Sequence, residues 1–228
     1  MKIGIMQPYL FPYLGYFQLM NAVDKYVFYD DVNYIKQGWI NRNNILVNGK
    51  KHLFSFDLTG ASSFKHINEI QINNNQKFKK TLQQSYCKAA FFKSVFPLIE
   101  SIIDFNDSNL AHYVINSLKS ISAFLNINTD FIKSSELAKD TTLKGQEKVI
   151  HICKLLGGSE YYNAIGGQEL YSKHDFEVAG ISLKFLKTKL AVYKQFNNDF
   201  IVGLSIIDVL MFNSVEKIQS MLKEYELL

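Results

Sequence analysis

The chain has little of what holds very small or secreted domains together. It contains only two cysteines and three prolines in 228 residues. Cys87 and Cys153 each lie in a helical pattern without a CxxC partner, which argues against a disulfide framework or a cysteine metal site. We expect both to be buried free thiols in a reducing compartment. Since 47% of the residues are hydrophobic, residues 1–228 can bury a core as a single domain.

Long hydrophobic runs and long runs of one charge are also absent. No segment approaches the roughly 20 apolar residues of a membrane-spanning helix. The apolar start, residues 2–6, is broken by Gln7 and Pro8, too early for a secretion signal. A cytoplasmic protein with no membrane span is therefore predicted. The net charge of +4 is only mildly basic, and no run of like charge is long enough for a nucleic-acid-binding arm. We therefore expect an anionic small molecule as partner rather than nucleic acid.

The common signatures of metal and covalent catalysis are missing. None of the five histidines forms an HxxxH pair, so no metal site is predicted. There is no GxSxG motif. His151 and Cys153 are two residues apart on a predicted helix and face different sides, so they are not expected to form a nucleophile pair. The sequence identifies no cofactor.

A stiff loop near the N-terminus is the first distinctive feature of the sequence. Two of the three prolines, Pro8 and Pro12, lie between an apolar strand at residues 2–6 and a helix predicted at 15–23. Proline disfavours the helical region for the residue before it, so Gln7 and Phe11 are predicted to be extended. A second strand at 25–29 completes a parallel βαβ start. The loop and Asp30-Asp31 would then lie on the sheet edge where α/β proteins bind ligands.

The rest of the chain predicts an α/β fold with a Rossmann-like start, a β-hairpin, a helical insert at about 74–127 and a C-terminal α/β portion. Asn48-Gly49 between two apolar runs indicates the hairpin. Asp107-Ser108 supplies a cap for the third helix of the insert. The further elements predicted from periodicity are strands at 67–72, 130–132, 160–162 and 181–186, and helices at 76–90, 92–103, 109–125, 145–156 and 214–225, the last capped by Ser214.

Two polar clusters follow the second strand. Adjacent carboxylates at Asp30 and Asp31 are suited to position a cation, an amine or a hydroxyl, and to take the proton of an amine. A divalent metal at this pair is left open, and the alternative is a turn or helix cap, where Asp is common. The next cluster combines cations, amides and the only tryptophan, a set that can clamp phosphate while the ring stacks on a sugar or base. Its members are Lys36, Trp39, Asn41, Arg42 and Asn43.

Two more clusters lie in the C-terminal half. Gly166-Gly167 follows a strand and leads to a helix start, where backbone N–H groups can face an anion, although glycine pairs are also common in turns. Asn163 and Tyr171 flank this pair, and Gln195 lies further on. Ser205 and Asp208 have the spacing of a capping box, which would make Asp208 architectural.

Four stretches together resemble the WbqC-like proteins essentially from end to end. They are Gln7-Pro8-x-x-x-Pro12-x-x-Gly15-Tyr16, Asp30-Asp31-Val32-x-Tyr34-x-Lys36-x-x-Trp39-x-Asn41-Arg42-Asn43, Asn163-x-x-Gly166-Gly167-x-x-Leu170-Tyr171 and Leu204-Ser205-Ile206-Ile207-Asp208. Members of that family are bacterial and often encoded among genes for O-antigen or lipopolysaccharide synthesis. The resemblance implies work on an activated sugar or its amine.

The resulting hypothesis is a transferase that binds a nucleotide-activated amino sugar and transfers an acyl or aminoacyl group to its amine. Asp30 or Asp31 would take the proton, Lys36 and Arg42 would hold phosphate, and Trp39 and Tyr16 would stack. The remaining candidate ligand-binding residues are Gln7, Tyr13, Asn41, Asn43, Asn163, Gly166, Gly167, Tyr171 and Gln195. A non-catalytic sugar-nucleotide-binding protein is the alternative, and a homodimer is left open.

The layout of the first strand and helix is also similar to that of nucleotidylyltransferases. In those enzymes a His-x-Gly-His motif at this place grips the triphosphate, whereas Tyr13 and Tyr16 stand at the two histidine positions here. A degenerate nucleotidylyltransferase-like enzyme is therefore a further alternative. A helix start preceded by a rigid loop still favours an anionic group.

Overall fold

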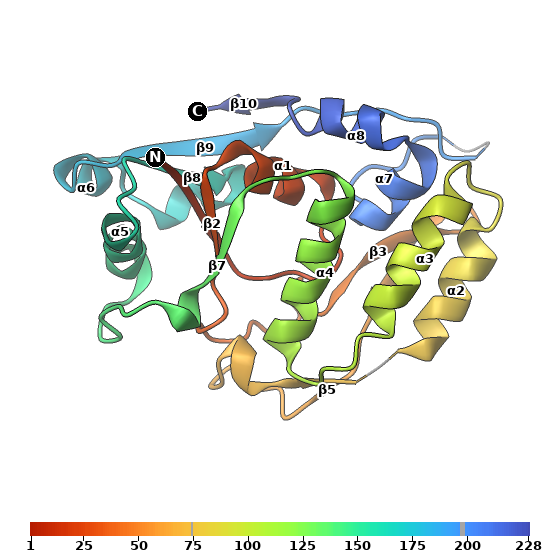
Figure 1. Cartoon of the computed structure of the whole chain (residues 1–228), viewed down its shortest axis with the longest axis horizontal. Coiled ribbons are helices and arrows are strands. Elements are labelled where there is room, and N and C mark those ends of the chain that lie inside the picture. Colours follow the sequence, from red (N-terminus) through yellow and green to blue (C-terminus); the bar gives the residue numbers. More distant parts are fainter. Residues whose placement is uncertain (74, 197–198) are drawn as a thin grey trace.

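A six-stranded, mostly parallel sheet forms the centre of the molecule in the computed structural model, which describes residues 1–73, 75–196 and 199–228 (Figure 1). Its strands are β1 (Lys2–Met6), β2 (Lys25–Phe28), β7 (Asp130–Lys133), β8 (Glu160–Ala164), β9 (Ser182–Thr188) and β10 (Tyr225–Leu227). They lie in the order β10-β9-β8-β1-β2-β7. All neighbours pair in parallel except β9 and β10, which are antiparallel.

The strand order reverses at β1. The chain goes from β1 to β2 on one side, and later returns from β7 to β8 on the other side of β1. In open α/β sheets the ligand crevice lies beyond the carboxyl ends of the strands at such a reversal. The loops that follow β1, β2, β7, β8 and β9 all begin at this carboxyl edge of the sheet.

Helices cover both faces of the sheet because alternate side chains of each strand point to opposite sides. Tyr26 and Phe28 of β2 join one buried cluster, whereas Val27 joins the other. The first cluster takes in residues of α1 (Leu14–Ala22), α4 (Leu110–Phe124), α7 (Ile206–Phe212) and α8 (Val215–Met221). The second takes in residues of α5 (Gly145–Leu155) and α6 (Lys173–Val178). Figure 1 shows α5 and α6 on the side of the sheet away from α4.

The hairpin and the helical insert extend the first cluster. The hairpin is β3 (Arg42–Val47) and β4 (Lys50–Ser55), and its turn is Asn48-Gly49, both with positive φ. The insert contains α2 (Gln76–Tyr86) and α3 (Phe92–Ile103) together with α4. Phe54 of β4 stacks on Phe78 of α2 with ring centroids 4.2 Å apart, which joins the hairpin to the insert. The predicted α/β class with hairpin and insert is confirmed.

Several local predictions were wrong. Residues 67–72 form a short helix η1 (Ile67–Glu69) and a two-residue strand β6 (Gln71–Ile72), which pairs with β5 (Leu58–Thr59), rather than one strand. Asn109, not Asp107 or Ser108, caps α4 by accepting a hydrogen bond from the His112 N–H at 3.2 Å. Asp107 instead accepts from the Asn109 N–H.

Two further expectations need correction. Phe11 is not extended but has a φ of +45°. Its carbonyl oxygen accepts hydrogen bonds from the Asn43 side chain at 2.8 Å and the Ser205 hydroxyl at 2.7 Å, and its ring is fully buried. These contacts override the local preference of a residue before proline. Of the two thiols, Cys153 is buried but Cys87 is exposed, because it lies just past the end of α2.

The N-terminal turn of α1 leaves room only for glycine at position 15. A Cβ at Gly15 would lie 2.3 Å from Thr188 Oγ1 and 2.6 Å from Tyr13 Cε2. We expect Gly15→Ala to lower the free energy of unfolding by about 1–3 kcal/mol, because the neighbouring side chains must shift. Urea unfolding of Gly15→Ala and of Gly15→Ala with Thr188→Ala tests this. The second change should restore part of the loss, and equal stability of the two variants would contradict the steric explanation.

Candidate functional site

The loop after β1 is held in place by hydrogen bonds at both ends. Tyr16, on α1, donates its hydroxyl to the Gln7 carbonyl at 2.8 Å. At the other end of the loop, Asn43 and Ser205 hold the Phe11 carbonyl as described above. Tyr16 is fully buried, with its ring 5.9 Å from that of Tyr26 and burial raising its pKa. Its position makes it a brace of the loop rather than a ring on which a ligand stacks.

The two adjacent aspartates have different surroundings. Asp30 is 1% exposed, and both of its carboxylate oxygens are engaged by Ser135. The Ser135 N–H donates to one oxygen at 2.9 Å and the Ser135 hydroxyl to the other at 2.6 Å. Asp30 therefore ties the loop after β2 to the loop after β7.

Asp31 is shared by two lysines. Lys139 Nζ lies 2.8 Å from Asp31 Oδ2, and Lys148 Nζ lies 3.4 Å from the same oxygen. The Lys139 side chain is only 3% exposed and that of Lys148 11%. Lys148 also lies over the ring of Tyr29, with Nζ 5.2 Å from its centroid. Two largely buried cations thus share one carboxylate, which leaves the group with a net positive charge.

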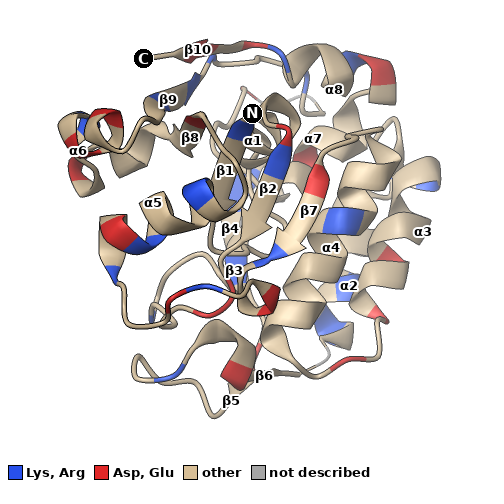
Figure 2. Ribbon diagram, turned by 60° about the vertical axis from the view of Figure 1, so that its left-hand side comes forward, with Lys and Arg blue, Asp and Glu red and all other residues tan. Residues whose placement is uncertain are grey.

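A cavity of about 420 Å³ opens beside this ion pair. The first residue of α5, Gly145, lies at its wall with a φ of +50°, and the side chain of Lys144 makes no capping hydrogen bond to the helix. The positive end of the helix dipole therefore faces the cavity. Figure 2 shows both blue, basic and red, acidic segments at the start of α5, and the acidic residue of this first turn is Glu147. The cavity is lined by Tyr29, Asp31, Val32, Asn33, His66, Thr141, Leu143, Lys144, Gly145 and Lys148.

Electrostatics keep Asp31 ionised. Burial alone would raise the pKa of Asp31, but hydrogen bonds from Lys139 and Ser134 and the charges of Lys139 and Lys148 outweigh it and hold the pKa below its usual range. Burial and the nearby Asp31 charge raise the pKa of Tyr29 above its usual range. At neutral pH Asp31 is therefore a carboxylate and Tyr29 a neutral phenol.

We expect this ion pair to stabilise the fold above the ordinary carboxyl pKa of about 3.9. Because the pKa of Asp31 is lowered in the folded state, its contribution is lost as the pH falls through that folded-state value. Urea unfolding of wild type and Asp31→Asn across acidic and neutral pH measures it. The stability difference should shrink as the pH falls below about 4, and a difference independent of pH would contradict this explanation.

The basic and aromatic segment after Asp31 lies outside the cavity. Arg42 donates through Nε to the Gly38 carbonyl at 2.8 Å and through Nη2 to the Gln37 carbonyl, and its guanidinium lies 5.9 Å from the Trp39 ring centre. Trp39 is 47% exposed, and Lys36 is also exposed. In this arrangement Arg42 holds the turn before it and does not point toward the cavity's lining residues.

Two of the amides predicted to orient a sugar form hydrogen bonds within the protein. Asn41 is 8% exposed, donates to the Phe56 carbonyl at 2.7 Å and accepts from the Tyr34 hydroxyl at 2.9 Å. Asn43 is 5% exposed and holds the Phe11 carbonyl. Both connect the hairpin to neighbouring loops.

The glycine pair lies in the short helix η3 (Ile165–Leu170) after β8. Asn163 is buried, accepts a hydrogen bond from the Ala164 N–H at 2.8 Å, and lies so close to Gly167 that a Cβ there would be 2.4 Å from its amide nitrogen. A Cβ at Gly166 would meet nothing within 4 Å. Tyr171 packs edge-on against Phe176, with ring centroids 5.8 Å apart.

The remaining candidates surround α7. Tyr13 lines a second, mainly apolar cavity of about 250 Å³ at the start of α1, together with Thr188 and Tyr193. Gln195 is fully buried and donates to Asp208 at 2.7 Å. Ser205 caps α7 by accepting from the Ile207 N–H at 3.2 Å. The reciprocal half of the predicted capping box is wrong, because the Asp208 carboxylate accepts hydrogen bonds from Gln195 and two tyrosines instead.

The predicted residues therefore do not gather in one cavity. Asp31 lines the basic cavity and Tyr13 the apolar one. Four residues at or beside the basic cavity were not predicted from the sequence: Tyr29, His66, Lys139 and Lys148. Lys148 could have been singled out from the sequence, because it lies in the first turn of a predicted helix. A positive side chain is unfavourable at this end of the helix dipole, so its presence there suggests another role. In the described part of the chain no cluster of three or more His, Cys, Asp or Glu is arranged to hold a metal ion.

Comparison with known proteins identifies the family of the chain. The profile of the WbqC-like protein family matches residues 7–220. The chain is also similar to an uncharacterized protein of Mycobacterium tuberculosis, Rv1507c, with 27% identity over 220 residues that cover 93% of each chain. No solved structure matches. Among the described residues, no helix is both long and apolar enough to cross a membrane.

Proposed function

The chain belongs to the WbqC-like protein family, and we propose that it binds a nucleotide-activated amino sugar in the cavity beside Asp31 and transfers an acyl or aminoacyl group to the sugar amine. The observation that carries the proposal is the sharing of one carboxylate by Lys139 and Lys148. Burying two cations beside a single anionic partner costs desolvation free energy, unless a second anion binds next to them.

A diphosphate supplies the missing charge. Lys148 is the cation nearer the cavity, since it lines the wall whereas Lys139 does not. The first turn of α5 offers backbone N–H groups beside it, and Lys144 lies at the mouth. Ammonium groups and helix N-termini are the usual partners of phosphate oxygens. The volume of about 420 Å³ accommodates a sugar and the adjoining phosphate.

The same wall supplies groups for the amine. Asp31 lines the cavity and its lowered pKa keeps it a carboxylate, whereas both carboxylate oxygens of Asp30 accept hydrogen bonds from Ser135. Of the two aspartates, Asp31 is therefore the one placed to accept a hydrogen bond from the sugar amine. His66 lines the cavity as well, and imidazole is the commonest general base in enzymes.

With an acyl thioester as donor, the transfer exchanges a C–S bond for a C–N bond. The amine lone pair attacks the acyl carbon and forms the C–N bond, while the C–S bond breaks and its electron pair leaves with sulfur. The proton released by the amine passes to His66 and from there to the thiolate. Asp31 stays ionised throughout and orients the amine, as expected from its lowered pKa.

Mass spectrometry tests this proposal. The purified protein is incubated with a panel of nucleotide-linked amino sugars and acyl or aminoacyl thioesters, and the sugar nucleotide is examined for the mass of the added group. Folded Asp31→Asn and His66→Gln should lose turnover. Full turnover in both variants would contradict the assigned roles, and binding without product over hours would favour a non-catalytic sugar-nucleotide-binding protein.

A nucleotidylyltransferase-like reaction has less support. It would need groups that grip a triphosphate at the start of α1. Tyr16 is buried there and donates its hydroxyl to Gln7, and Tyr13 lines the mainly apolar cavity.

A further inference from the structure

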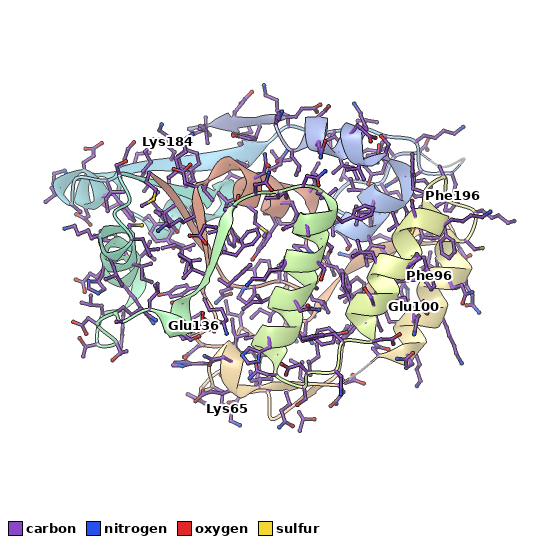
Figure 3. The ribbon with its side chains drawn as sticks, in the orientation of Figure 1. Lys65, Phe96, Glu100, Glu136, Lys184 and Phe196 are labelled. Atoms are coloured by element: carbon purple, nitrogen blue, oxygen red, sulfur yellow. The ribbon has the colours of Figure 1, made fainter. Side chains whose placement is uncertain are left out.

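An exposed apolar and basic surface lies next to the cavity and plays no part in the function proposed above. Two loops form it, residues 35–42 and 60–65. They are joined where the Tyr34 N–H donates to the Lys65 carbonyl at 2.9 Å and where Asn33 and His66 form an antiparallel bridge. Figure 3 places Lys65 at the lower end of the molecule. We name this surface the basic-aromatic tip, and it consists of Ile35, Lys36, Trp39, Arg42, Phe64 and Lys65.

The apolar side chains of the tip are unusually exposed for a stable loop. Phe64 is 91% exposed, Ile35 53% and Trp39 47%. The turn that carries Ile35 is closed by a hydrogen bond from the Gly38 N–H to the Ile35 carbonyl at 3.1 Å, and Arg42 braces it. These side chains are thus presented by an ordered backbone. An exposed phenylalanine contributes none of the stabilisation that its burial would give. The exposure of Phe64 therefore indicates that another surface covers it when the protein functions.

The segment that carries the tip is basic. Residues 32–66 contain five Lys and Arg against one Asp, and three of these five cations, Lys36, Arg42 and Lys65, belong to the tip, whereas the other two lie in β4. The remaining residues carry twenty of each sign. Within the tip, three cations accompany the three apolar side chains and there is no acid.

We infer that the basic-aromatic tip binds the surface of an anionic lipid bilayer. Tryptophan and phenylalanine insert at the boundary between headgroups and acyl chains, while lysine and arginine contact the anionic headgroups. Aliphatic Ile35 cannot stack on a base, which disfavours single-stranded nucleic acid. A second copy of the chain would bring two tips of like charge together. The mouth of the cavity would then face the membrane surface, since Asn33 and His66 belong to both the wall and the base of the tip.

Trp39 provides a direct test because it is the only tryptophan of the chain. Its fluorescence is recorded while the full-length protein is titrated with vesicles of phosphatidylcholine alone, or of phosphatidylcholine with phosphatidylglycerol. We expect the emission to move to shorter wavelength with the anionic vesicles only, and high salt to reverse the change. An unchanged spectrum with anionic vesicles would overturn the inference. So would a response to a single-stranded oligonucleotide without a response to vesicles.

Sedimentation with the same vesicles supplies a matched comparison. Phe64→Ser should weaken partitioning about tenfold or more, since a buried phenylalanine is lost. Val178→Ser is the control, because Val178 is 76% exposed but lies on α6, away from the tip. Equal loss in both variants, or vesicle binding that survives Phe64→Ser unchanged, would overturn the inference. Light scattering without vesicles shows whether the protein instead dimerises through the tip, and such a dimer would overturn the inference as well. The result of the vesicle experiments does not depend on the result of the transferase assay.

Discussion

Replacing Asp208 with alanine is expected to lower the free energy of unfolding by about 3–5 kcal/mol, or the melting temperature by about 10 °C. Asp208 is fully buried and accepts hydrogen bonds from Tyr86 at 2.9 Å, Tyr193 at 2.8 Å and Gln195 at 2.7 Å. The Tyr86 hydroxyl in turn accepts from the Leu46 N–H at 2.8 Å. The carboxylate therefore joins α7, α2, the hairpin and the loop after β9. Its removal takes away the acceptor of the Tyr86 and Tyr193 hydroxyls and one acceptor of the buried Gln195 amide, which also donates to the Ile201 carbonyl.

The comparison is Asp57→Ala, which removes an exposed carboxylate and should change stability little. Urea unfolding of both variants measures the difference. A loss at Asp208→Ala no larger than that at Asp57→Ala would contradict the account of Asp208 as the joint of these elements.

The pH dependence of Asp208→Asn gives the same network an independent check. Burial raises the pKa of Asp208 above its usual range, against the hydrogen bonds from Tyr193, Gln195 and Tyr86 that lower it. The folded protein therefore keeps this proton to higher pH than the unfolded chain. Wild-type stability relative to Asp208→Asn should fall as the pH rises from about 4 through the raised folded-state pKa. A relative stability that rises with pH would contradict this sign.

Replacing Lys148 with methionine is expected to weaken binding of a nucleotide-linked sugar by about tenfold to a hundredfold. Methionine keeps much of the side-chain volume over Tyr29 but removes the ammonium group that would contact phosphate. Charge-assisted hydrogen bonds of this kind contribute about 1.5–3 kcal/mol. Calorimetric titration of the variant and wild type measures the change.

Lys154→Met is the matched control, because Lys154 lies in the last turn of the same helix. It should bind as wild type does. If both variants lose affinity equally, the loss reflects general charge and not the cavity. If neither loses affinity, the phosphate lies elsewhere.

The strands and helices with a clear repeat were predictable because local pattern and tertiary environment agree. The hairpin turn at Asn48-Gly49 has the positive φ values that these residue types adopt readily. The periodicity of the sequence did not indicate α7, because six of its seven residues are buried and it shows no polar face. Only the capping-box spacing of Ser205 and Asp208 indicated a helix start there. β10 was missed because three residues show no periodicity, and its place depends on pairing with β9.

The candidate site was only partly predictable. The position of Asp31 after β2 indicated the sheet edge beside which the basic cavity opens. The proximity of Lys139 and Lys148 was not predictable, because the connection from β7 to β8 brings them to Asp31 from more than 100 residues away in the sequence. Asn41, Asn43 and Arg42 have the composition of a ligand clamp, but their hydrogen bonds are used to hold loops. Residue type alone cannot separate these two uses.

The most direct test of the central claim is a crystal structure of the protein with a nucleotide-linked amino sugar. We predict phosphate oxygens within about 3 Å of Lys148 Nζ and of the N–H groups in the first turn of α5. The sugar amine should lie at hydrogen-bond distance from Asp31. A ligand seated in the apolar cavity at the start of α1, with the cavity beside Asp31 empty, would contradict the claim.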